Sequence, residues 1–272
     1  MKENTARELE RLFSLEGKVV YMTGAAGGIG AVLSKKLASC GALMAVGGRH
    51  LDKVRELAEE IQREGNAAFP VEVDVSDLSS IERATESIVK RCGKIDVLIT
   101  MAAVNKRVPI LHNDEKTWDT ITGINLKGAY FTGQSVGRQM VKQRSGSIIN
   151  VASYNSFMML GGVGIYGAAK SGILAVTRAQ AIEWAQFGVR SNALLPGHIS
   201  TPLTTQLWTD PKRSGFLLDR IAMARPGKPE DLTGMTVLLA SDASSYMTGM
   251  FYVVDGGCFA GGQPWDIGIS YE

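Results

Sequence analysis

A short apolar segment, a cluster of glycines and a helical pattern follow one another directly near the start of the chain. Residues 18–23 contain VVYMT, the kind of apolar run that a buried parallel strand shows. The motif TGAAGGIG (23–30) follows, and leucines at helical spacing continue toward Gly41. Glycines at such a turn let backbone N–H groups approach a pyrophosphate at the helix N-terminus. This order predicts a dinucleotide-binding α/β fold, in which the cofactor contacts Gly24, Gly28, Ile29 and Gly30.

Apolar segments and helical patterns then alternate as far as residue 254. Further strands are expected at 42–47, 67–73, 95–101, 147–152, 189–195 and 251–254, and helices at 51–64, 78–92, 114–144, 166–186 and 229–240. Such alternation favours a doubly wound parallel sheet with helices on both faces. No linker or repeat interrupts 18–257, so we expect a single Rossmann-like domain of about seven strands. Residues 1–17 are expected to form an N-terminal extension and residues 258–272 a C-terminal tail.

Net charge, cysteine content and hydropathy indicate which partners and which cellular compartment to expect. The formal net charge is +2, which gives no reason to expect a nucleic-acid partner. The three cysteines are odd in number and far apart, which fits a reducing compartment better than a disulfide framework. The N-terminus lacks the apolar core of a signal peptide, and no apolar run reaches the ~18 residues of a membrane span. We expect a cytoplasmic protein with no membrane association, and the three scattered histidines predict no metal site.

The end of the second expected strand bears on the choice between NAD and NADP. An acid there would bind the ribose hydroxyls of NAD, but Gly48 and Arg49 stand in its place. A guanidinium suits a 2′-phosphate, so the sequence favours NADP over NAD, although Arg49 could instead be solvated or stack on adenine. Asp74, at the end of the third strand, can offer an acid to the adenine edge. Asp77 is a candidate N-cap of the following helix.

Ser153, Tyr166 and Lys170 form the main candidate for chemistry. Tyr166 and Lys170 are four positions apart and share one face of a helix. A phenol normally ionises near pH ~10, and a neighbouring ammonium favours the phenolate. Such a tyrosine could exchange a proton with an alcohol or ketone near neutral pH, while the Ser153 hydroxyl holds the same oxygen. A core tyrosine beside a solvated lysine is the alternative.

The motifs taken together resemble the short-chain dehydrogenase/reductase family over residues 13–257. They are TGAAGGIG, the pair Asp74-Val75, INLKG with Asn125, INVAS ending in Ser153, YGAAK (166–170), PGHIST (196–201) and VVDGG (253–257). Thirteen positions separate the serine from the tyrosine, which is the spacing usual in that family. The resemblance implies an NAD(P)-dependent oxidoreductase that moves a hydride between nicotinamide and a secondary alcohol or ketone.

The resemblance also implies roles for single residues. Tyr166 would be the general acid/base, and Ser153 would polarise the substrate oxygen. Lys170 would bind the nicotinamide ribose and lower the pKa of Tyr166, and Asn125 would hold a water that relays protons from Lys170. Cofactor contacts are further implied for Val75, Ala102, Pro196, Ile199 and Thr201.

One turn departs from the family pattern. An NNAG-like turn usually follows the fourth strand, whereas this chain has Thr100, Met101, Ala102 and Ala103. Ala103 adds a Cβ where the backbone would pass close to the adenine ribose, and Thr100 lacks a side-chain amide that braces the strand. We expect a slightly shifted cofactor pose, with affinity affected more than chemistry.

Within the family, the opening over 12–30 and the stretch 204–221 are similar to gluconate 5-dehydrogenases and related keto-deoxy-gluconate dehydrogenases. Lys106 and Arg107, in the loop after the fourth strand, could bind the carboxylate of a sugar acid. Asn155 is a further candidate substrate contact. The resemblance therefore implies a small sugar-acid or polyol/ketose substrate under a lid formed by about 199–224. A solvated basic loop is the alternative for the two cations.

Two other functions stay open. Phe157, Met158, Met159 and Leu160 follow the serine and would make an apolar wall, which suits a 3-oxoacyl thioester or small apolar ketone reductase. A catalytically silent dinucleotide-binding regulator is a different class, against which the intact Ser153, Tyr166 and Lys170 argue. The resemblance also implies a homo-oligomer, a tetramer or dimer. Trp265 in the tail is either an anchor for a neighbouring subunit or part of a frayed terminus.

Overall fold

A single sheet of seven strands forms the centre of the molecule. The computed structural model describes residues 2–202 and 204–264. The strand order is β3-β2-β1-β4-β5-β6-β7, and every neighbouring pair is parallel. The strands are β1 (Val19–Thr23), β2 (Leu43–Gly48), β3 (Ala68–Glu72), β4 (Val97–Thr100), β5 (Gly146–Val151), β6 (Val189–Pro196) and β7 (Phe251–Val254). The order reverses direction between β1 and β4, so ligands are expected to bind beyond the carboxyl ends of these two strands.

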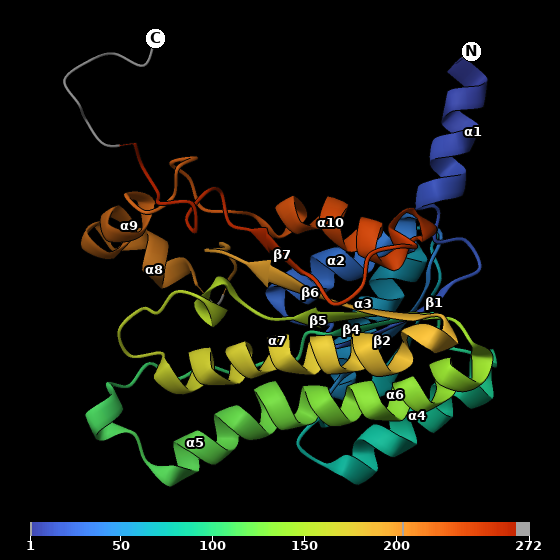
Figure 1. Ribbon diagram of the computed structural model, residues 1–272, viewed down its shortest axis with the longest axis horizontal. Helices are drawn as coiled ribbons and strands as arrows, with labels where there is room; N and C mark the ends of the chain where they lie inside the picture. The colour runs from blue at the N-terminus through green and yellow to red at the C-terminus, as the bar shows by residue number, and fades with distance from the viewer. Residues whose placement is uncertain (1, 203, 265–272) are drawn as a thin grey trace.

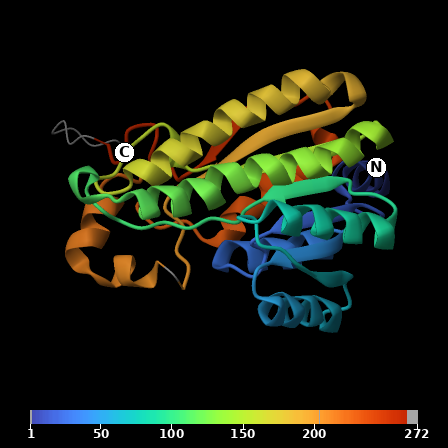
Figure 2. The same ribbon diagram turned by 90° about the horizontal axis from the view of Figure 1, so that it is seen from below.

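Helices cover both faces of this sheet (Figures 1 and 2). One face carries α2 (Gly28–Ser39), α3 (Leu51–Arg63) and α10 (Thr233–Ala240), and the other carries α4 (Leu78–Cys92), α6 (Ala129–Gln143) and α7 (Gly164–Trp184). Strands buried on both faces must be apolar throughout, and all five residues of β1 are buried. The expected doubly wound α/β fold is confirmed.

The helix expected over 114–144 is continuous but not uniform. It consists of α5 (Glu115–Thr122), a π-helical segment η2 (Gly123–Gly128) and α6. A π-helical turn takes up more residues than an α-helical one and is often found at functional sites. Asn125 lies in this segment.

Shorter elements complete the chain. They are α1 (Lys2–Phe13), α8 (Thr205–Thr209), α9 (Pro211–Leu218) and the 3₁₀ helices η1 (Ile110–His112), η3 (Tyr154–Ser156), η4 (Ala185–Phe187), η5 (Pro229–Leu232) and η6 (Asp242–Ser244). Asp77 caps α4 as expected, because its side chain accepts a hydrogen bond from the backbone N–H of Ser79. Figure 1 shows α1 projecting at the end of the molecule opposite to α8 and α9.

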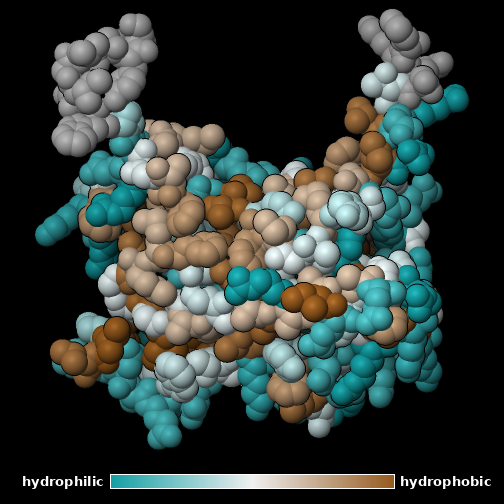
Figure 3. Space-filling view, in the orientation of Figure 1, coloured by the Kyte–Doolittle hydropathy of each residue, from teal (hydrophilic) through white to brown (hydrophobic). Residues whose placement is uncertain are grey.

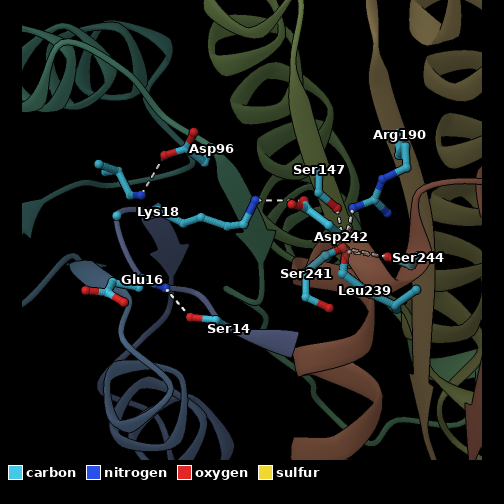
Figure 4. Close-up of polar contacts among 12 residues, drawn as sticks. Ser14, Glu16, Lys18, Asp96, Ser147, Arg190, Leu239, Ser241, Asp242 and Ser244 are labelled. Carbon is cyan, nitrogen blue, oxygen red and sulfur yellow. Dashed lines mark hydrogen bonds and ion pairs between the residues drawn. The ribbon is translucent and has the colours of Figure 1, made fainter. Parts of the chain in front are cut away.

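Polar contacts connect the amino-terminal ends of β1 and β6 to the C-terminal end of α10 (Figure 4). Nη2 of Arg190 donates to the carbonyls of Leu239 and Ser241 at 3.2 and 3.1 Å. Nζ of Lys18 lies 2.8 Å from Oδ1 of Asp242. A cavity of about 540 Å³ opens among these residues, away from the glycine turn and Ser153. The contacts satisfy helix-end carbonyls and hold the scaffold together.

Within residues 2–202 and 204–264, no helix is long and apolar enough to cross a membrane. The same part of the chain contains no cluster of three or more histidine, cysteine or acidic side chains that could hold a metal ion.

Candidate active site

The carboxyl ends of four strands bring most of the expected site residues to one edge of the sheet. The glycine turn follows β1, Ala102 follows β4, Ser153 follows β5, and Pro196 ends β6. The helices α8 and α9 lie at the same end of the molecule (Figure 1). This is the edge at which open parallel sheets bind ligands.

The glycine turn leaves backbone where side chains would otherwise be. Gly24 has a φ of +68°, and a Cβ there would lie 2.7 Å from Cα of Ala102. A Cβ on Gly28 would lie 3.0 Å from Cβ of Thr201, so the segment after β6 passes directly over the turn. The first turn of α2 has no side-chain cap and no acidic residue. Its free N–H groups and positive end fit the pyrophosphate of a dinucleotide.

Arg49 and Asp74 lie near each other at the ends of β2 and β3, where they can face the adenosine part of a dinucleotide. Burial acts to raise the pKa of Asp74, but two hydrogen bonds from Ser76 and the charge of Arg49 outweigh it and lower that pKa. Arg49 itself is exposed. The side chain of Val75 is buried in the core, so only its backbone is available to a ligand.

Ser153, Tyr166 and Lys170 are brought together by β5 and α7. The Ser153 hydroxyl accepts a hydrogen bond from the backbone N–H of Asn155 at 3.1 Å, and it lies near enough to the Tyr166 phenol to lower the pKa of that group. Nζ of Lys170 donates to the carbonyl of Val151 at 2.6 Å and lies 5.9 Å from the centre of the Tyr166 ring. The three side chains form one polar group at the end of β5.

The pKa of Tyr166 is raised in this structure, which is opposite to the direction expected beside Lys170. Burial raises the pKa of the Tyr166 phenol, and the hydrogen bond with Ser153 offsets only part of that rise. Burial also lowers the pKa of Lys170 to about 8, and its ammonium is directed at the Val151 carbonyl. Desolvation is therefore the dominant influence on both groups, and the phenol is protonated at neutral pH.

Asn125 braces the loop after β4. Its side-chain N–H donates to the carbonyl of Val104 and its side-chain oxygen accepts from the Val104 backbone N–H, both at 2.8 Å. The Asn125 side chain is fully buried. Its amide is thus directed at the loop that holds Arg107, and not at Lys170.

Thr100 lacks the side-chain amide usual at this position, but its hydroxyl makes a bracing contact instead. The Thr100 hydroxyl donates to Oδ1 of Asn150 at 2.9 Å. Nδ2 of Asn150 in turn donates to Oγ1 of Thr177 and Oε1 of Gln180 at 3.1 and 2.9 Å. This buried network joins β4, β5 and α7, so a hydroxyl performs the bracing. The close approach to Gly24 is made by Ala102 and not by Ala103.

Lys106 and Arg107, the two expected substrate-binding cations, have different neighbours in the structure. Nζ of Lys106 donates to Oγ1 of Thr117 at 3.1 Å, which directs it to the first turn of α5. The charge of Arg107 instead acts on Tyr154 and His198, beside Ser153. Of the two cations, Arg107 is therefore the one placed near the catalytic group.

The turn after β6 is ordered by a threonine that the sequence patterns did not indicate. Ile199 is buried and forms a parallel bridge with Gly227. Thr204 accepts a hydrogen bond from the backbone N–H of Thr201 at 2.8 Å and donates to the carbonyl of Ile199 at 3.0 Å. The expected lid segment is therefore anchored at its start and then continues into α8 and α9.

Tyr154, His198 and Trp208 lie beside these residues and were not among the expected site residues. Oη of Tyr154 lies 2.9 Å from Nε2 of His198, and the His198 and Trp208 rings are 6.2 Å apart. The available signals were the position of Tyr154 directly after Ser153, the place of His198 in PGHIST, and the place of Trp208 in the stretch 204–221. His198 and Trp208 reach this place only through tertiary structure.

Comparison with known proteins gives consistent findings. A family model described as Enoyl-(Acyl carrier protein) reductase matches residues 24–258. The chain is 38% identical over 251 residues to the 2-dehydro-3-deoxy-D-gluconate 5-dehydrogenase of Dickeya dadantii, covering 91% of this chain and 98% of that protein. It is 37% identical over 243 residues to the 3-oxoacyl-(acyl-carrier-protein) reductase of Thermotoga maritima, covering 89% and 98%. The crystal structure of a gluconate 5-dehydrogenase from Burkholderia cenocepacia, in complex with NADP and tartrate, matches with a TM-score of 0.90 at 31% identity, over 93% of this chain and 99% of that one.

Proposed function

Because the chain belongs to the short-chain dehydrogenase/reductase family, we propose that it is an NAD(P)-dependent oxidoreductase that interconverts a secondary alcohol and a ketone on a sugar acid. The observation that carries this proposal is the placement of Ser153, Tyr166 and Lys170 together at the same end of the sheet as the uncapped first turn of α2. A proton donor and a place for a dinucleotide thus meet at one edge of the sheet.

In the direction of ketone reduction, the protonated phenol of Tyr166 donates its proton to the carbonyl oxygen. The Ser153 hydroxyl donates a hydrogen bond to the same oxygen and stabilises the charge that develops there. When bound, a nicotinamide cofactor supplies the hydride for reduction or accepts it for oxidation. The proposed role of Lys170 is to bind a ribose hydroxyl and to exchange protons with the phenol, which is supported by its Nζ lying 5.9 Å from the centre of the Tyr166 ring.

NADP is the proposed cofactor, since the exposed guanidinium of Arg49 stands at the end of β2. A change of Arg49→Glu would replace attraction to a 2′-phosphate by repulsion. We expect kcat/KM for NADP to fall by about 100-fold and that for NAD to change much less. Steady-state kinetics with both cofactors would measure this. Arg55→Glu, which changes an exposed arginine on α3, is the matched control, and an equal loss with both cofactors would contradict the assignment.

The sugar-acid substrate is tested by following nicotinamide absorbance at about 340 nm with both cofactors. Gluconate, a neutral polyol and a 3-oxoacyl thioester represent the three substrate classes. Turnover of gluconate or a keto-gluconate supports the proposal. Turnover of the thioester alone would favour the second candidate, an acyl-thioester or apolar ketone reductase. That candidate is supported by Met158 and Leu160, which pack in one apolar cluster with Tyr154.

A homo-oligomer, a dimer or tetramer, is proposed from the exposed edge of the sheet. β7 is an edge strand with the apolar sequence FYVV. Figure 3 views this edge, where apolar side chains gather along the middle of the face. Phe157 stacks near Phe251 and Phe259, with ring centres 6.2 and 5.4 Å apart. A neighbouring subunit that packs against such an edge strand would remove its apolar side chains from solvent. Trp265, the expected tail anchor, lies outside the described residues.

The substitution Met250→Glu tests this surface. Met250 precedes β7 and is 57% exposed, so a carboxylate there would have to be desolvated in a contact between subunits. We expect light scattering to report a smaller assembly than for the wild type. Leu111→Glu is the control, because Leu111 is 93% exposed in η1. An unchanged mass for Met250→Glu would exclude this edge as the contact.

The proposed place of action is the cytoplasm. The three cysteines are free, and Cys258 is buried while Cys40 and Cys92 are half-buried. A reducing compartment keeps such thiols in this form.

A further inference from the structure

A polar aromatic cluster that includes one residue of the lid segment lies beside the catalytic group. Tyr154 comes from η3, His198 from the turn after β6, and Trp208 from α8. The Tyr154 and His198 rings are 4.7 Å apart with a hydrogen bond of 2.9 Å between Oη and Nε2. The Trp208 ring meets the His198 ring edge-on at 6.2 Å. Three segments that are distant in sequence thus converge next to Ser153.

Three buried polar atoms of η3 and α8 have no hydrogen-bond partner within the part of the chain that the structure describes, and one of them is Oγ of Ser156. The other two have fixed hydrogen-bonding roles. They are Nε1 of Trp208, which can only donate, and Oδ1 of Asn155, which can only accept. Buried polar groups in native proteins are normally satisfied, and an exception calls for a ligand or a function. A hydroxyl group both donates and accepts, so a polyhydroxylated ligand could satisfy both atoms.

Charges around the cluster favour an anionic ligand. Burial and the charges of Arg107 and Arg220 lower the pKa of His198 to about 4, and Asp255 opposes this only in part. The imidazole is therefore neutral at pH 7 and adds no competing charge. Arg220 is held on the lid, since its guanidinium lies 3.5 Å from the centre of the Phe216 ring and donates to the Phe216 carbonyl at 2.8 Å. Arg107, in the loop after β4, acts on the same histidine and on Tyr154.

We propose that His198 and Trp208 determine substrate specificity by binding the hydroxyl chain of a polyhydroxy carboxylate, with Arg220 of the lid binding its carboxylate. This inference rests on the proposed function, because the reacting carbon must lie at Ser153 and Tyr166. The lid residues then bind the end of the substrate that does not react. The neutral His198 ring accepts or donates one hydrogen bond, and the Trp208 indole donates another. A carboxylate bound beside His198 would interact with the positive charges of both Arg220 and Arg107.

The experiment compares Trp208→Phe and His198→Phe, which keep an aromatic ring but lose the polar nitrogen, with the wild type. Initial rates are measured with NADP for gluconate, for sorbitol as a neutral polyol, and for cyclohexanol as an apolar alcohol. We expect KM for gluconate to rise about tenfold in each variant, with a smaller change in kcat. The ratio of kcat/KM for gluconate to that for cyclohexanol should fall by a similar factor. Trp118→Phe, half-exposed on α5, is the matched control.

Arg220→Ala separates the carboxylate from the hydroxyl chain. It should raise KM for gluconate about tenfold and leave the preference for sorbitol over cyclohexanol near the wild-type value. Equal losses for all three alcohols in the Trp208 and His198 variants would show a packing role and overturn the inference alone. A wild-type enzyme that turns over cyclohexanol but neither gluconate nor sorbitol would overturn the proposed function. Thermal unfolding of each variant checks that the fold is retained.

Discussion

Replacing Tyr166 by phenylalanine is expected to lower kcat by about 10³-fold while leaving cofactor affinity nearly unchanged. The substitution removes only the phenolic hydroxyl, which interacts with Ser153 and is the proposed proton donor. The aromatic ring remains, so its packing against neighbouring residues and its distance from Lys170 are preserved. Initial rates by nicotinamide absorbance measure kcat, and a titration of NADPH fluorescence measures affinity.

Two further variants are needed to interpret this result. Tyr130→Phe changes an exposed tyrosine on α6 and should retain wild-type kcat. Ser153→Ala should lower kcat by about 10²-fold, because it removes one donor to the developing oxyanion and leaves the acid in place. If Tyr166→Phe kept more than about a tenth of the wild-type kcat, another group would have to protonate the substrate oxygen. The regulator interpretation would instead be favoured if the wild type bound cofactor but turned over no substrate.

The fold could be predicted because its signals are local in the chain. Each buried parallel strand reads as an apolar run, and each βα turn is marked by glycine or by a cap such as Asp77. The π-helical segment around Asn125 could not be predicted, since a single wide turn hardly changes the apolar spacing of a long helix. Its consequence is visible only in three dimensions, where the Asn125 amide meets the backbone of Val104.

The site was predicted where residues act within one motif and less well where they depend on neighbours. Tyr166 and Lys170 were placed correctly on one helix, but burial of both groups reversed the expected direction of the tyrosine pKa. Adjacent residues Lys106 and Arg107 read alike in sequence, yet Thr117 holds one of them away from the catalytic group. Desolvation and such contacts depend on residues far along the chain, so spacing alone cannot give them.

Substitution of Gly24 by alanine is expected to raise the Kd for NADP by at least about tenfold and to lower thermal stability. Two costs combine at this position. A φ of +68° disfavours any residue with a Cβ, at about 1–2 kcal/mol. The added Cβ would also lie 2.7 Å from Cα and 2.8 Å from the backbone nitrogen of Ala102, and backbone cannot yield as a flexible side chain can. The turn would therefore move away from β4, and the first N–H groups of α2 would move with it.

Gly65→Ala separates the two costs, because Gly65 has a similar φ of +83° but open space around its Cβ. It lies beyond α3, away from the glycine turn, so it should lower the melting temperature by a few degrees and leave the Kd for NADP unchanged. Differential scanning calorimetry and NADPH fluorescence titration on both variants give the comparison. The additional loss of NADP affinity and thermal stability in Gly24→Ala then gives the effect of the close approach between Ala102 and the turn. If Gly24→Ala bound NADP as tightly as Gly65→Ala, the position of the turn would not control how the cofactor's pyrophosphate is held.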